Sequence, residues 1–468
     1  MNLKIKDILN CTNGKLIIGN DDYECTNYSK DTRTINKRDT YIGIKGENFD
    51  GNLFWKDALN KGADVVIVNE IEISQEEKEK YEKENKNIIV VNDTIIALGE
   101  MAKFKREMYC KSLKVIGITG SVGKTSTKDM IANVVSQKYK TLKTEGNYNN
   151  NIGLPLTILR IKDEEVAVIE MGMNHLGEIS YLSKIAKPDI SVITNVGTAH
   201  IGNLGSRENI LKAKLEILDG MENKVLIINN DNDLLHNWNI TDAQNVEVHT
   251  FGIEEKKECT AENIVLNETS SEFTCIYNRE KFKIEVPVYG EHFILNSLCA
   301  VSVGKLLNIR NEQIWEGIKT FKLTAKRMEI NHLKNNITII NDSYNANFES
   351  MKAALLSLNN INCQRKIAVL GDMFELGNFS EKLHREIGIE IAKSNINKIF
   401  LIGDNSKYIA EEAVNSGYNI ENIGIFNNNE ELYEYLKNNI LEGDTILFKA
   451  SNGIKLFNVV EKLIKDLI

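Results

Sequence analysis

Apolar runs alternate with helix-like polar patterns along the central part of the chain. One apolar run begins at Lys114, and three more end at Glu170, Thr194 and Asn229. All four are typical of buried strands, and helical patterns separate them. Strands that alternate with helices indicate a doubly wound sheet of parallel strands. We therefore predict a central α/β domain.

Similar patterns flank this central part on both sides. Residues 1–110 hold short apolar runs, a charged helix-like segment, and a helix that we expect from Thr94 to Met108. A less regular stretch with strand-like character spans Val246–Val288, and a helix is expected at Glu291–Leu307. After about Lys322 the alternation of strands and helices starts again.

The length agrees with this division, because 468 residues at roughly 150 residues per domain give about three domains. We predict a smaller N-terminal α/β domain, a central domain of the phosphate-loop type built on a parallel sheet, and a C-terminal α/β domain that is Rossmann-like. The predicted ranges are 1–110, 111–323 and 324–468.

Composition and charge exclude several classes of protein. The net charge is −9 and no basic run occurs, which argues against a nucleic-acid partner. No segment approaches the ~18 apolar residues of a membrane span, and the N-terminus lacks the apolar core of a signal peptide. The seven cysteines form no CxxC pair, so reduced, buried thiols are expected. We expect a cytoplasmic protein and a monomer.

The most specific motif is GITGSVGKTSTK at Gly117–Lys128, between a predicted strand and a predicted helix. Glycines let backbone N–H groups turn toward a phosphate, Lys124 can reach the β- and γ-phosphates, and the Thr125 hydroxyl can bind Mg²⁺. The strict pattern has glycine where this chain has Ile118. The alternative is a glycine-rich turn with a chance Lys-Thr pair. The predicted loop residues are Gly120, Ser121, Val122, Gly123, Lys124, Thr125 and Ser126.

Three side chains beyond this loop fall where strands end or helices start. Glu170 ends an apolar run, His200 lies in a glycine-rich loop, and Lys214 lies on a predicted helix. Ligands of open α/β sheets bind beyond the carboxyl ends of the strands, so Glu170 and His200 are expected to face the phosphates. A carboxylate and an imidazole suit Mg²⁺ or Mn²⁺. Taken singly, each residue also fits a plain structural role: a strand-end charge, a loop histidine or a solvated lysine.

Nine segments, in order along nearly the whole chain, resemble the Mur ligases, the ATP-dependent amide-forming enzymes of bacterial cell-wall synthesis. The first segment and NDSYNAN at 341–347 favour the branch that adds D-alanyl-D-alanine to UDP-N-acetylmuramoyl-tripeptide. The similar segments are 31–51, 117–128, 144–157, 168–179, 194–206, 213–217, 290–300, 341–351 and 371–377.

The resemblance implies that the central domain binds ATP and two Mg²⁺ ions. Lys214 matches the lysine that is carbamylated in the family. His292 and Asn296 fall where the family holds the nucleotide base, although the pair also fits local hydrogen bonds at a helix start. The implied catalytic residues are Lys124, Glu170, His200, Lys214 and Arg327, and the implied metal ligands are Thr125, Glu170, His200 and Lys214.

The resemblance also implies where the substrates bind. The first domain would bind the UDP end, a loop of the central domain would lie near the muramoyl-peptide, and the C-terminal domain would contact nucleotide and dipeptide. The residues implied for the UDP end are Asp31, Thr32, Arg33, Lys45 and Gly46. Those implied near the muramoyl-peptide are Asn147, Asn151 and Thr157. Those implied for nucleotide and dipeptide are Arg327, Asp342, Tyr344, Asn345 and Asn347. For the asparagines at 149–151, composition bias in a polar loop is the alternative.

Three positions depart from the family pattern. Phe348 stands where the family usually has proline, which loosens one turn and removes no functional side chain. Asn452 stands in place of an arginine, and Phe457 stands near an expected acid. The last two departures concern contacts to the acceptor and to the peptide carboxylates, and they leave the ATP site unaffected.

These residues imply a ligase that first converts a peptide carboxylate to an acyl phosphate, which the amine of D-alanyl-D-alanine then attacks. Domain closure is expected to keep water from the acyl phosphate. Two other classes fit part of the pattern: a sister ligase, such as another Mur ligase or a folylpolyglutamate synthase, and a nucleotide-binding regulator. The N-terminal segment argues against the first class. A nucleotide-binding regulator is disfavoured by the combination of the phosphate loop with Glu170, His200 and Lys214.

Overall fold

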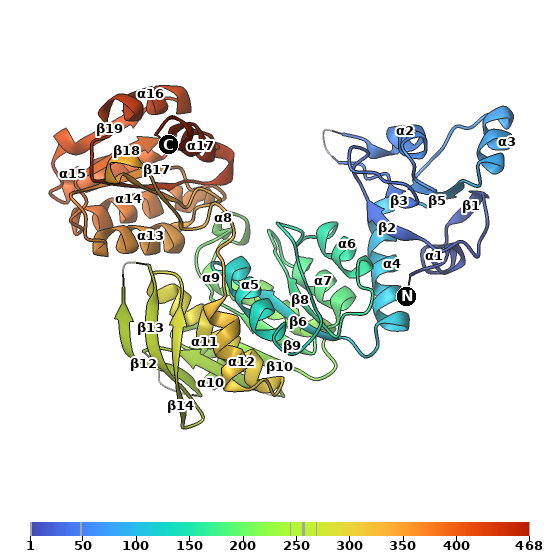
Figure 1. Ribbon diagram of the computed structural model, residues 1–468, viewed down its shortest axis with the longest axis horizontal. Coiled ribbons are helices and arrows are strands. Elements are labelled where there is room, and N and C mark those ends of the chain that lie inside the picture. Colours follow the sequence, from blue (N-terminus) through green and yellow to red (C-terminus); the bar gives the residue numbers. More distant parts are fainter. Residues whose placement is uncertain (1, 47–48, 244, 255–257, 268, 468) are drawn as a thin grey trace.

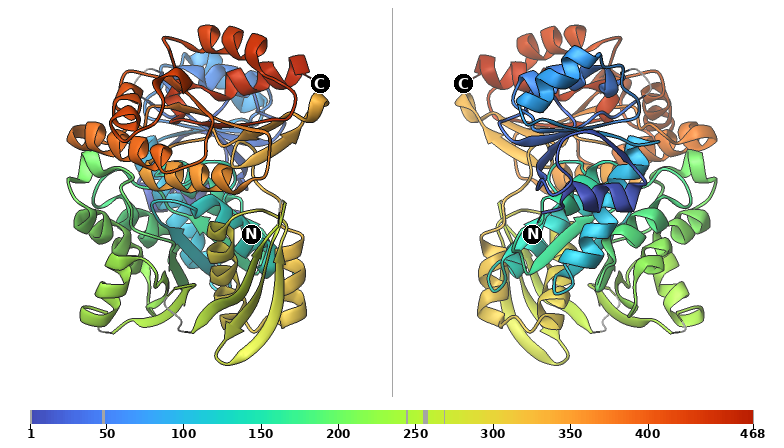
Figure 2. Two further views of the ribbon diagram at one scale, coloured as in Figure 1. Left: turned by 90° about the vertical axis from the view of Figure 1, so that its left-hand side faces the viewer. Right: turned by 90° about the vertical axis from the view of Figure 1, so that its right-hand side faces the viewer.

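Three α/β units, each built on its own sheet, follow one another along the chain in the computed structural model (Figure 1). The structure describes residues 2–467 except 47–48, 244, 255–257 and 268. The N-terminal and C-terminal units lie toward opposite ends of the long axis (Figure 1), and both rise from the same side of the central unit (Figure 2). The predicted three-part α/β architecture is confirmed.

The N-terminal unit has a five-stranded sheet in the order β1-β5-β4-β3-β2. β1 runs antiparallel to β5, and the other neighbouring pairs are parallel. Both faces of β4 are covered, because Val66 and Val68 pack with Ala58 and Leu59 of α2 while the alternate residues face the cluster of α1 and α4. The strands are β1 (Lys15–Ile18), β2 (Thr26–Ser29), β3 (Asp39–Ile42), β4 (Val65–Val68) and β5 (Asn87–Val90). The helices are α1 (Ile5–Thr12), η1 (Gly51–Phe54), α2 (Trp55–Asn60), α3 (Gln75–Lys83) and α4 (Thr94–Tyr109).

Helix α4 joins the N-terminal unit to the central one. Asp93 caps its start, since the carboxylate accepts from two backbone N–H groups of the first turn. Near its end, buried Lys105 donates to the Leu159 carbonyl at 2.7 Å, and Arg106 donates to the Ala186 carbonyl at 3.0 Å. The helix expected at Thr94–Met108 is confirmed, and the boundary near 110 stays a prediction because this helix belongs to both units.

The central unit has a nine-stranded sheet in the order β14-β13-β12-β11-β10-β9-β6-β8-β7. Its strands are β6 (Lys114–Thr119), β7 (Thr141–Lys143), β8 (Val166–Glu170), β9 (Ile190–Ile193), β10 (Val225–Asn229), β11 (Glu247–Gly252), β12 (Cys259–Leu266), β13 (Ser271–Tyr277) and β14 (Glu280–Val286). Its helices are α5 (Lys124–Val135), α6 (Gly153–Leu159), α7 (Glu178–Ala186), α8 (Ile201–Leu204), α9 (Arg207–Leu215), η2 (Glu216–Gly220), α10 (Asp233–Thr241), α11 (Glu291–Leu306) and α12 (Asn311–Lys319).

The order of these strands places β6 in the interior of the sheet, third from the edge formed by β7. β6 lies between β8 and β9 and runs parallel to both. The chain passes from β6 to β7 on one side and later from β8 to β9 on the other, so the direction of winding changes at β6. The stretch at Val246–Val288 extends the same sheet: β11 and β12 are parallel, whereas β12, β13 and β14 form an antiparallel meander.

The C-terminal unit has a six-stranded sheet in the order β15-β16-β20-β17-β18-β19, in which the pairing of β15 with β16 is antiparallel and the remaining pairs are parallel. Its strands are β15 (Glu329–His332), β16 (Thr338–Asn341), β17 (Arg365–Gly371), β18 (Lys398–Ile402), β19 (Ile423–Phe426) and β20 (Asp444–Lys449). Its helices are η3 (Lys334–Asn336), α13 (Phe348–Asn360), η4 (Gly377–Phe379), α14 (Ser380–Ala392), α15 (Ser406–Asn415), η5 (Ile420–Asn422), α16 (Asn429–Asn439), η6 (Asn452–Ile454) and α17 (Phe457–Leu467).

The boundary predicted near 323 falls between α12 and β15 and stays a prediction. All seven cysteines are free thiols, five of them buried, which agrees with the expectation of reduced thiols. Within the described residues, no helix combines the length and apolar character needed to cross a bilayer.

Candidate functional site

One cavity of about 820 Å³ lies between the central and C-terminal units. Most of the residues predicted from the sequence line it. From the central unit these are Ser121, Val122, Gly123, Lys124, Thr125, Ser126, Asn147, Asn151, Glu170, His200, His292 and Asn296; from the C-terminal unit they are Arg327, Asp342, Tyr344, Asn345 and Asn347. The predicted residues outside this lining are Gly120, Thr157, Lys214, Asp31, Thr32, Arg33, Lys45 and Gly46.

The phosphate loop connects β6 to α5 and is held in shape by the end of β9. Asn195 Oδ1 accepts from the backbone N–H groups of Ser121 and Val122 at 3.1 and 2.9 Å. The Thr194 hydroxyl donates to the Val122 carbonyl at 2.7 Å. Gly123 precedes α5 with φ of 83°, a backbone conformation that glycine adopts readily. The loop therefore presents the N-terminus of α5 to the cavity, as a phosphate site requires.

Lys124 folds back onto this loop, where its ammonium donates to the Gly120 carbonyl at 2.7 Å. Desolvation in the cavity lowers the pKa of Lys124, and the nearby charge of Arg327 acts in the same direction, whereas Glu170 opposes both. A polyanion entering the cavity would relieve this cost, because it supplies the missing negative charge.

Glu170 ends β8 with both carboxylate oxygens engaged. Oε2 accepts from the Thr125 hydroxyl at 3.0 Å, and Oε1 accepts from Asn149 Nδ2 at 2.8 Å. The Gly172 N–H donates to the Asn149 carbonyl at 2.8 Å, which fixes the asparagine in turn. Asn149 thus has specific partners in the site, which composition bias alone would not produce.

His200 precedes the short helix α8, and its ring is 21% exposed on the cavity wall. Its Nδ1 lies 2.5 Å from Glu375 Oε2 of the C-terminal unit. This contact with His200 lowers the pKa of Glu375. The histidine is therefore held by a carboxylate from a different unit.

Lys214 lies on α9 and is only 1% exposed, whereas Lys212 on the same helix is exposed. Burial lowers the pKa of Lys214 well below its usual range; the charge of Lys124 acts in the same direction, and Glu349 opposes it. The solvated-lysine interpretation is therefore wrong for Lys214, because the side chain is removed from water. It applies to Lys212.

Helix α11 supplies His292 and Asn296. Burial lowers the pKa of His292 to about 4, so the ring is neutral at pH 7, and it lies 4.2 Å from the Phe293 ring. Asn296 Oδ1 accepts from the Thr127 hydroxyl at 3.0 Å, which ties α11 to the helix after the phosphate loop. For Asn296 the hydrogen bond is therefore made across two helices and is not local to the helix start.

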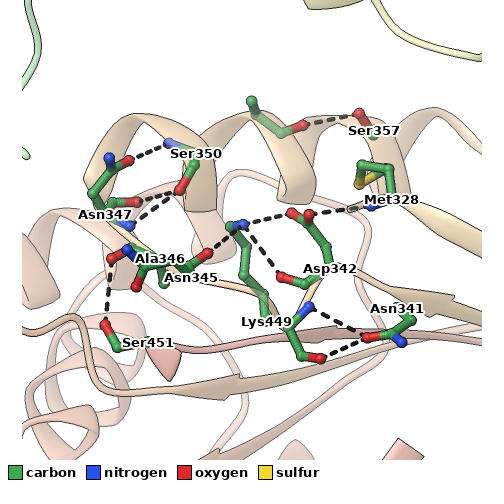
Figure 3. A network of polar contacts seen from close by, with 12 residues as sticks. Met328, Asn341, Asp342, Asn345, Ala346, Asn347, Ser350, Ser357, Lys449 and Ser451 are labelled. Carbon is green, nitrogen blue, oxygen red and sulfur yellow. Dashed lines mark hydrogen bonds and ion pairs between the residues drawn. The ribbon is translucent and has the colours of Figure 1, made fainter. Parts of the chain in front are cut away.

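The opposite wall is a polar network of the C-terminal unit (Figure 3). Buried Lys449 pairs with Asp342 and donates to the Asn345 carbonyl at 3.2 Å, while the Met328 N–H donates to Asp342 Oδ1 at 3.1 Å. Arg327 lies on the same wall, and these groups together place both signs of charge opposite the phosphate loop.

Two further predicted residues on this wall have partners within the C-terminal unit. The Arg327 guanidinium lies 4.1 Å from the centre of the Tyr344 ring. Asn347 caps α13, because its Oδ1 accepts from the Ser350 N–H at 2.9 Å (Figure 3). The ring orients the arginine side chain, and the cap fixes the start of the helix that follows the NDSYNAN segment.

Some predicted residues are not brought to the cavity. Thr157 is fully buried in α6, and its hydroxyl donates to the Gly153 carbonyl at 2.9 Å. The candidates for the UDP end lie on the N-terminal unit; Asp31 and Arg33 pair with each other at 2.7 Å, and Lys45 pairs with Asp50 at 3.6 Å.

Sequence reasoning missed several residues of the site, including Asn149, Asn195 and Lys449. Asn195 directly follows the run that ends at Thr194, and Lys449 ends β20, so their positions at strand ends were the available signal. Ile95 and Ile96 of α4 also line the cavity, and nothing in their local pattern indicated a role beyond packing.

The residues present fit Mg²⁺. Thr125 and Glu170 offer oxygen atoms beside the phosphate loop, and His200 offers a nitrogen. Within the described part of the chain, no three His, Cys, Asp or Glu side chains gather as a metal site. Mg²⁺ commonly binds one or two protein groups and takes its remaining ligands from water and phosphate oxygens.

These features define a P-loop nucleotide-binding enzyme: a phosphate loop after β6, a carboxylate at the end of β8, and a second α/β unit that faces the loop. Three family models match: Mur ligase family, catalytic domain at 24–106; Mur ligase middle domain at 118–304; and Mur ligase, glutamate ligase domain at 326–452. The chain belongs to the Mur ligase family.

Individual relatives match over the full length. UDP-N-acetylmuramoyl-tripeptide–D-alanyl-D-alanine ligase of Bacillus subtilis (strain 168) is 38% identical over 99% of this chain and 98% of its own. The crystal structure of MurF from Acinetobacter baumannii superposes with a TM-score of 0.87 at 29% identity, covering 99% of both chains. The MurF ligase from Thermotoga maritima in complex with ADP has a TM-score of 0.80 at 26% identity, covering 94% of this chain and 97% of its own.

Gly120→Ala is expected to weaken ADP binding about 5–150-fold. A Cβ at this position would lie 1.9 Å from Thr194 Oγ1, so the loop must shift at a cost of about 1–3 kcal/mol. Isothermal titration with ADP measures the change. Gly46→Ala is the matched control, because its Cβ would meet nothing nearer than 3.7 Å. Equal ADP affinity in both variants would contradict the role of this turn.

Proposed function

We propose that this Mur ligase joins D-alanyl-D-alanine to UDP-N-acetylmuramoyl-tripeptide with conversion of ATP to ADP and phosphate, in peptidoglycan precursor synthesis. The observation that carries the proposal is the cavity that the phosphate loop shares with Arg327, Asp342 and Lys449 of the C-terminal unit. The name of the Bacillus subtilis relative, at 38% identity over 99% of this chain, supports the choice of substrates.

The proposed chemistry follows from the weakness of a carboxylate as an electrophile. ATP phosphorylates the terminal carboxylate of the peptide, the amine of the dipeptide attacks the acyl phosphate, and the tetrahedral intermediate expels phosphate. Phosphoryl transfer depends mainly on positioning and on neutralising charge. Lys124 at the start of α5 and Arg327 on the opposite wall would supply positive charge from two sides. The C-terminal unit, which faces the phosphate loop, would keep water away from the acyl phosphate.

Two Mg²⁺ ions belong to the proposal. Thr125 and Glu170 would hold the ion beside the β- and γ-phosphates, and His200 and a carbamate on Lys214 would hold the second. When bound, the ions neutralise phosphate charge. The contact of 3.0 Å between the Thr125 hydroxyl and Glu170 supports the first pair, since both present oxygen atoms at one point. The ring of His200 on the cavity wall supports the second.

The base and peptide sites extend the proposal. Neutral His292, beside Phe293, would pack against the nucleotide base. Asn147 and Asn151 on the cavity wall would contact the muramoyl-peptide. The UDP end is placed on the N-terminal unit, at Asp31–Arg33 and Lys45–Gly46. A substrate with a nucleotide at one end and a carboxylate at the other suits two separate sites.

A sister ligase with another amino-acid acceptor is the alternative. It shares the ATP half of the site and differs in its substrates, so a product assay separates the two. UDP-N-acetylmuramoyl-tripeptide, ATP and D-alanyl-D-alanine are combined, and the pentapeptide product is identified by mass. ADP release that requires the dipeptide supports the proposal. Product with single amino acids and none with the dipeptide contradicts it.

Location and assembly complete the proposal. ATP and UDP-linked precursors are metabolites of the cytoplasm, which supports placing the enzyme there. The seven free thiols suit the same compartment. The expected monomer stays a prediction, and no partner beyond these small molecules is proposed.

Carbamylation of Lys214 is proposed on chemical grounds. A neutral amine adds CO₂ and releases a proton to give a carbamate anion, and the lowered pKa of Lys214 favours the neutral amine. The product replaces a buried cation, which Lys124 repels, with an anion that bears two oxygen atoms. Oxygen atoms of this type are the ligands that Mg²⁺ prefers.

Lys124→Ala is expected to lower kcat at least about 10²–10³-fold, the loss typical of removing one charge contact to a transition state. The reason is that the loop holds no other ammonium of similar reach. Steady-state ligation measures the effect, with thermal unfolding to check the fold. Lys322→Ala, at an exposed position, is the control. Near-normal turnover in Lys124→Ala would remove the ATP-site assignment.

Lys214→Ala is expected to remove most activity, and an added small carboxylic acid is expected to restore part of it by occupying the vacated space. Lys212→Ala tests the neighbouring exposed lysine and should do neither. Mass analysis in bicarbonate measures the modification directly. Only free lysine in the active enzyme, or full turnover of Lys214→Ala, would overturn the carbamate.

Asn452→Arg is expected to lower KM for D-alanyl-D-alanine or for the tripeptide substrate. Asn452 Nδ2 donates to the Tyr344 carbonyl at 3.1 Å, so the position adjoins a cavity residue. An arginine there can form the bidentate pair with a carboxylate that asparagine cannot form. KM is measured for both substrates. If neither KM decreases, this position does not bind a substrate carboxylate.

A further inference from the structure

The loop that carries His200 is held from outside by the C-terminal unit. His200 Nδ1 lies 2.5 Å from Glu375 Oε2, and the Gly202 N–H donates to the Glu375 carbonyl at 3.0 Å. A second carboxylate of that unit, on Glu349, accepts from the Thr198 N–H at 2.7 Å and from its hydroxyl at 3.0 Å. The ring of His200 and the backbone on both sides of it are therefore fixed by a different unit.

The two loops approach each other so closely that side chains are excluded where they meet. A Cβ on Gly202 would lie 2.5 Å from the Gly377 nitrogen, and a Cβ on Gly197 would lie 2.5 Å from the Glu349 carboxylate carbon. These are contacts that no ordinary Cβ makes. The sequence therefore places glycines where the interface needs them, on both sides of His200.

The paired residues themselves have an uncommon backbone conformation. His200 has φ of 64° and Glu375 has φ of 63°, in the left-handed region that residues other than glycine rarely adopt. Such conformations cost free energy and persist where the surrounding structure enforces them, most often at functional sites. Here both partners of one side-chain contact show the feature, which indicates that their contact is built into the interface.

We infer that Glu375 is a positioning residue for His200: it holds Nδ1 across the interface and leaves Nε2 for the metal in the cavity. The inference rests on the metal-ligand role of His200 proposed above. His200 lines the cavity, whereas Glu375 is not part of its lining. Glu375 therefore acts through the histidine and does not touch the substrates.

The physical reason lies in the two nitrogens of imidazole. A metal ligand must be a neutral ring with a lone pair on the coordinating nitrogen. A carboxylate that accepts the Nδ1–H selects this tautomer, fixes the ring plane and makes the other nitrogen more basic. Because the carboxylate comes from the C-terminal unit, the second metal site is complete only while that unit is docked.

The test measures metal binding instead of turnover. Mn²⁺ is titrated into the full-length enzyme with saturating ADP, and free Mn²⁺ is followed by electron paramagnetic resonance. Glu375→Ala is expected to weaken the His200-dependent Mn²⁺ site about 10–100-fold, the usual effect of removing such a carboxylate. Glu375→Gln should lose less, because its amide oxygen still accepts the Nδ1–H and its shape preserves the fold. Glu442→Ala, at an exposed position of the same unit, is the matched control and should bind like the wild type.

Two further variants separate this inference from the proposed function. If His200→Ala leaves Mn²⁺ binding unchanged, the metal-ligand role of His200 is wrong and the inference falls with it. If His200→Ala weakens binding while Glu375→Ala matches the control, only the positioning role is overturned. In His200→Ala/Glu375→Ala the second change should add nothing to the first. An independent further loss would show that Glu375 acts by another route and would overturn the inference.

Discussion

The site depends on one electrostatic constraint: positively charged side chains lie close to one another where little water reaches them. Burial and Lys124 both depress the pKa of Lys214, and desolvation and Arg327 depress that of Lys124. Glu170 opposes the effect on Lys124, although its oxygens are already engaged by Thr125 and Asn149. The positive charges of Lys124 and Lys214 are therefore only partly compensated by the neighbouring carboxylates. A nucleotide triphosphate would add negative charge there, as would the carbamate proposed on Lys214.

The sheet of the central unit explains how these groups meet. The phosphate loop follows β6, Glu170 ends β8 and Asn195 follows β9, and the carboxyl ends of these three neighbouring parallel strands share one edge. The N-terminus of α5 adds its partial positive charge at the same place. Asn195 and Thr194 hold the loop from the side, and Asn195 accepts from the N–H groups of Ser121 and Val122, so the loop backbone is fixed before any phosphate binds. Preorganisation of this kind lowers the cost of binding a charged ligand.

The flanking units close the cavity from two directions. On one side the Asp342–Lys449 pair and Arg327 give a polar wall, and the carboxylates of Glu349 and Glu375 fasten the C-terminal unit to the His200 loop. On the other side α4 carries the N-terminal unit and brings Ile96, which is 62% exposed, to the cavity lining. A cavity with one polar and one partly apolar end suits a long substrate that bears a nucleotide and a peptide.

The sequence by itself determined the elements whose signal is local. The buried run at Lys114–Thr119, the phosphate loop after it and the helix at Thr94–Tyr109 follow from apolar periodicity, glycine spacing and a capping aspartate. The family resemblance added the roles expected of Glu170, His200 and Lys214. Only the tertiary structure decided that Lys214 is buried while Lys212 is exposed, and that the Thr157 hydroxyl donates a hydrogen bond within α6. It also decided that Asn149 binds Glu170 and that Glu375 binds His200, 175 positions away by their numbering in the chain. The physical reason is that burial and pairing are properties of the space between elements, which depends on how separate strands and loops pack and is not encoded in any one segment.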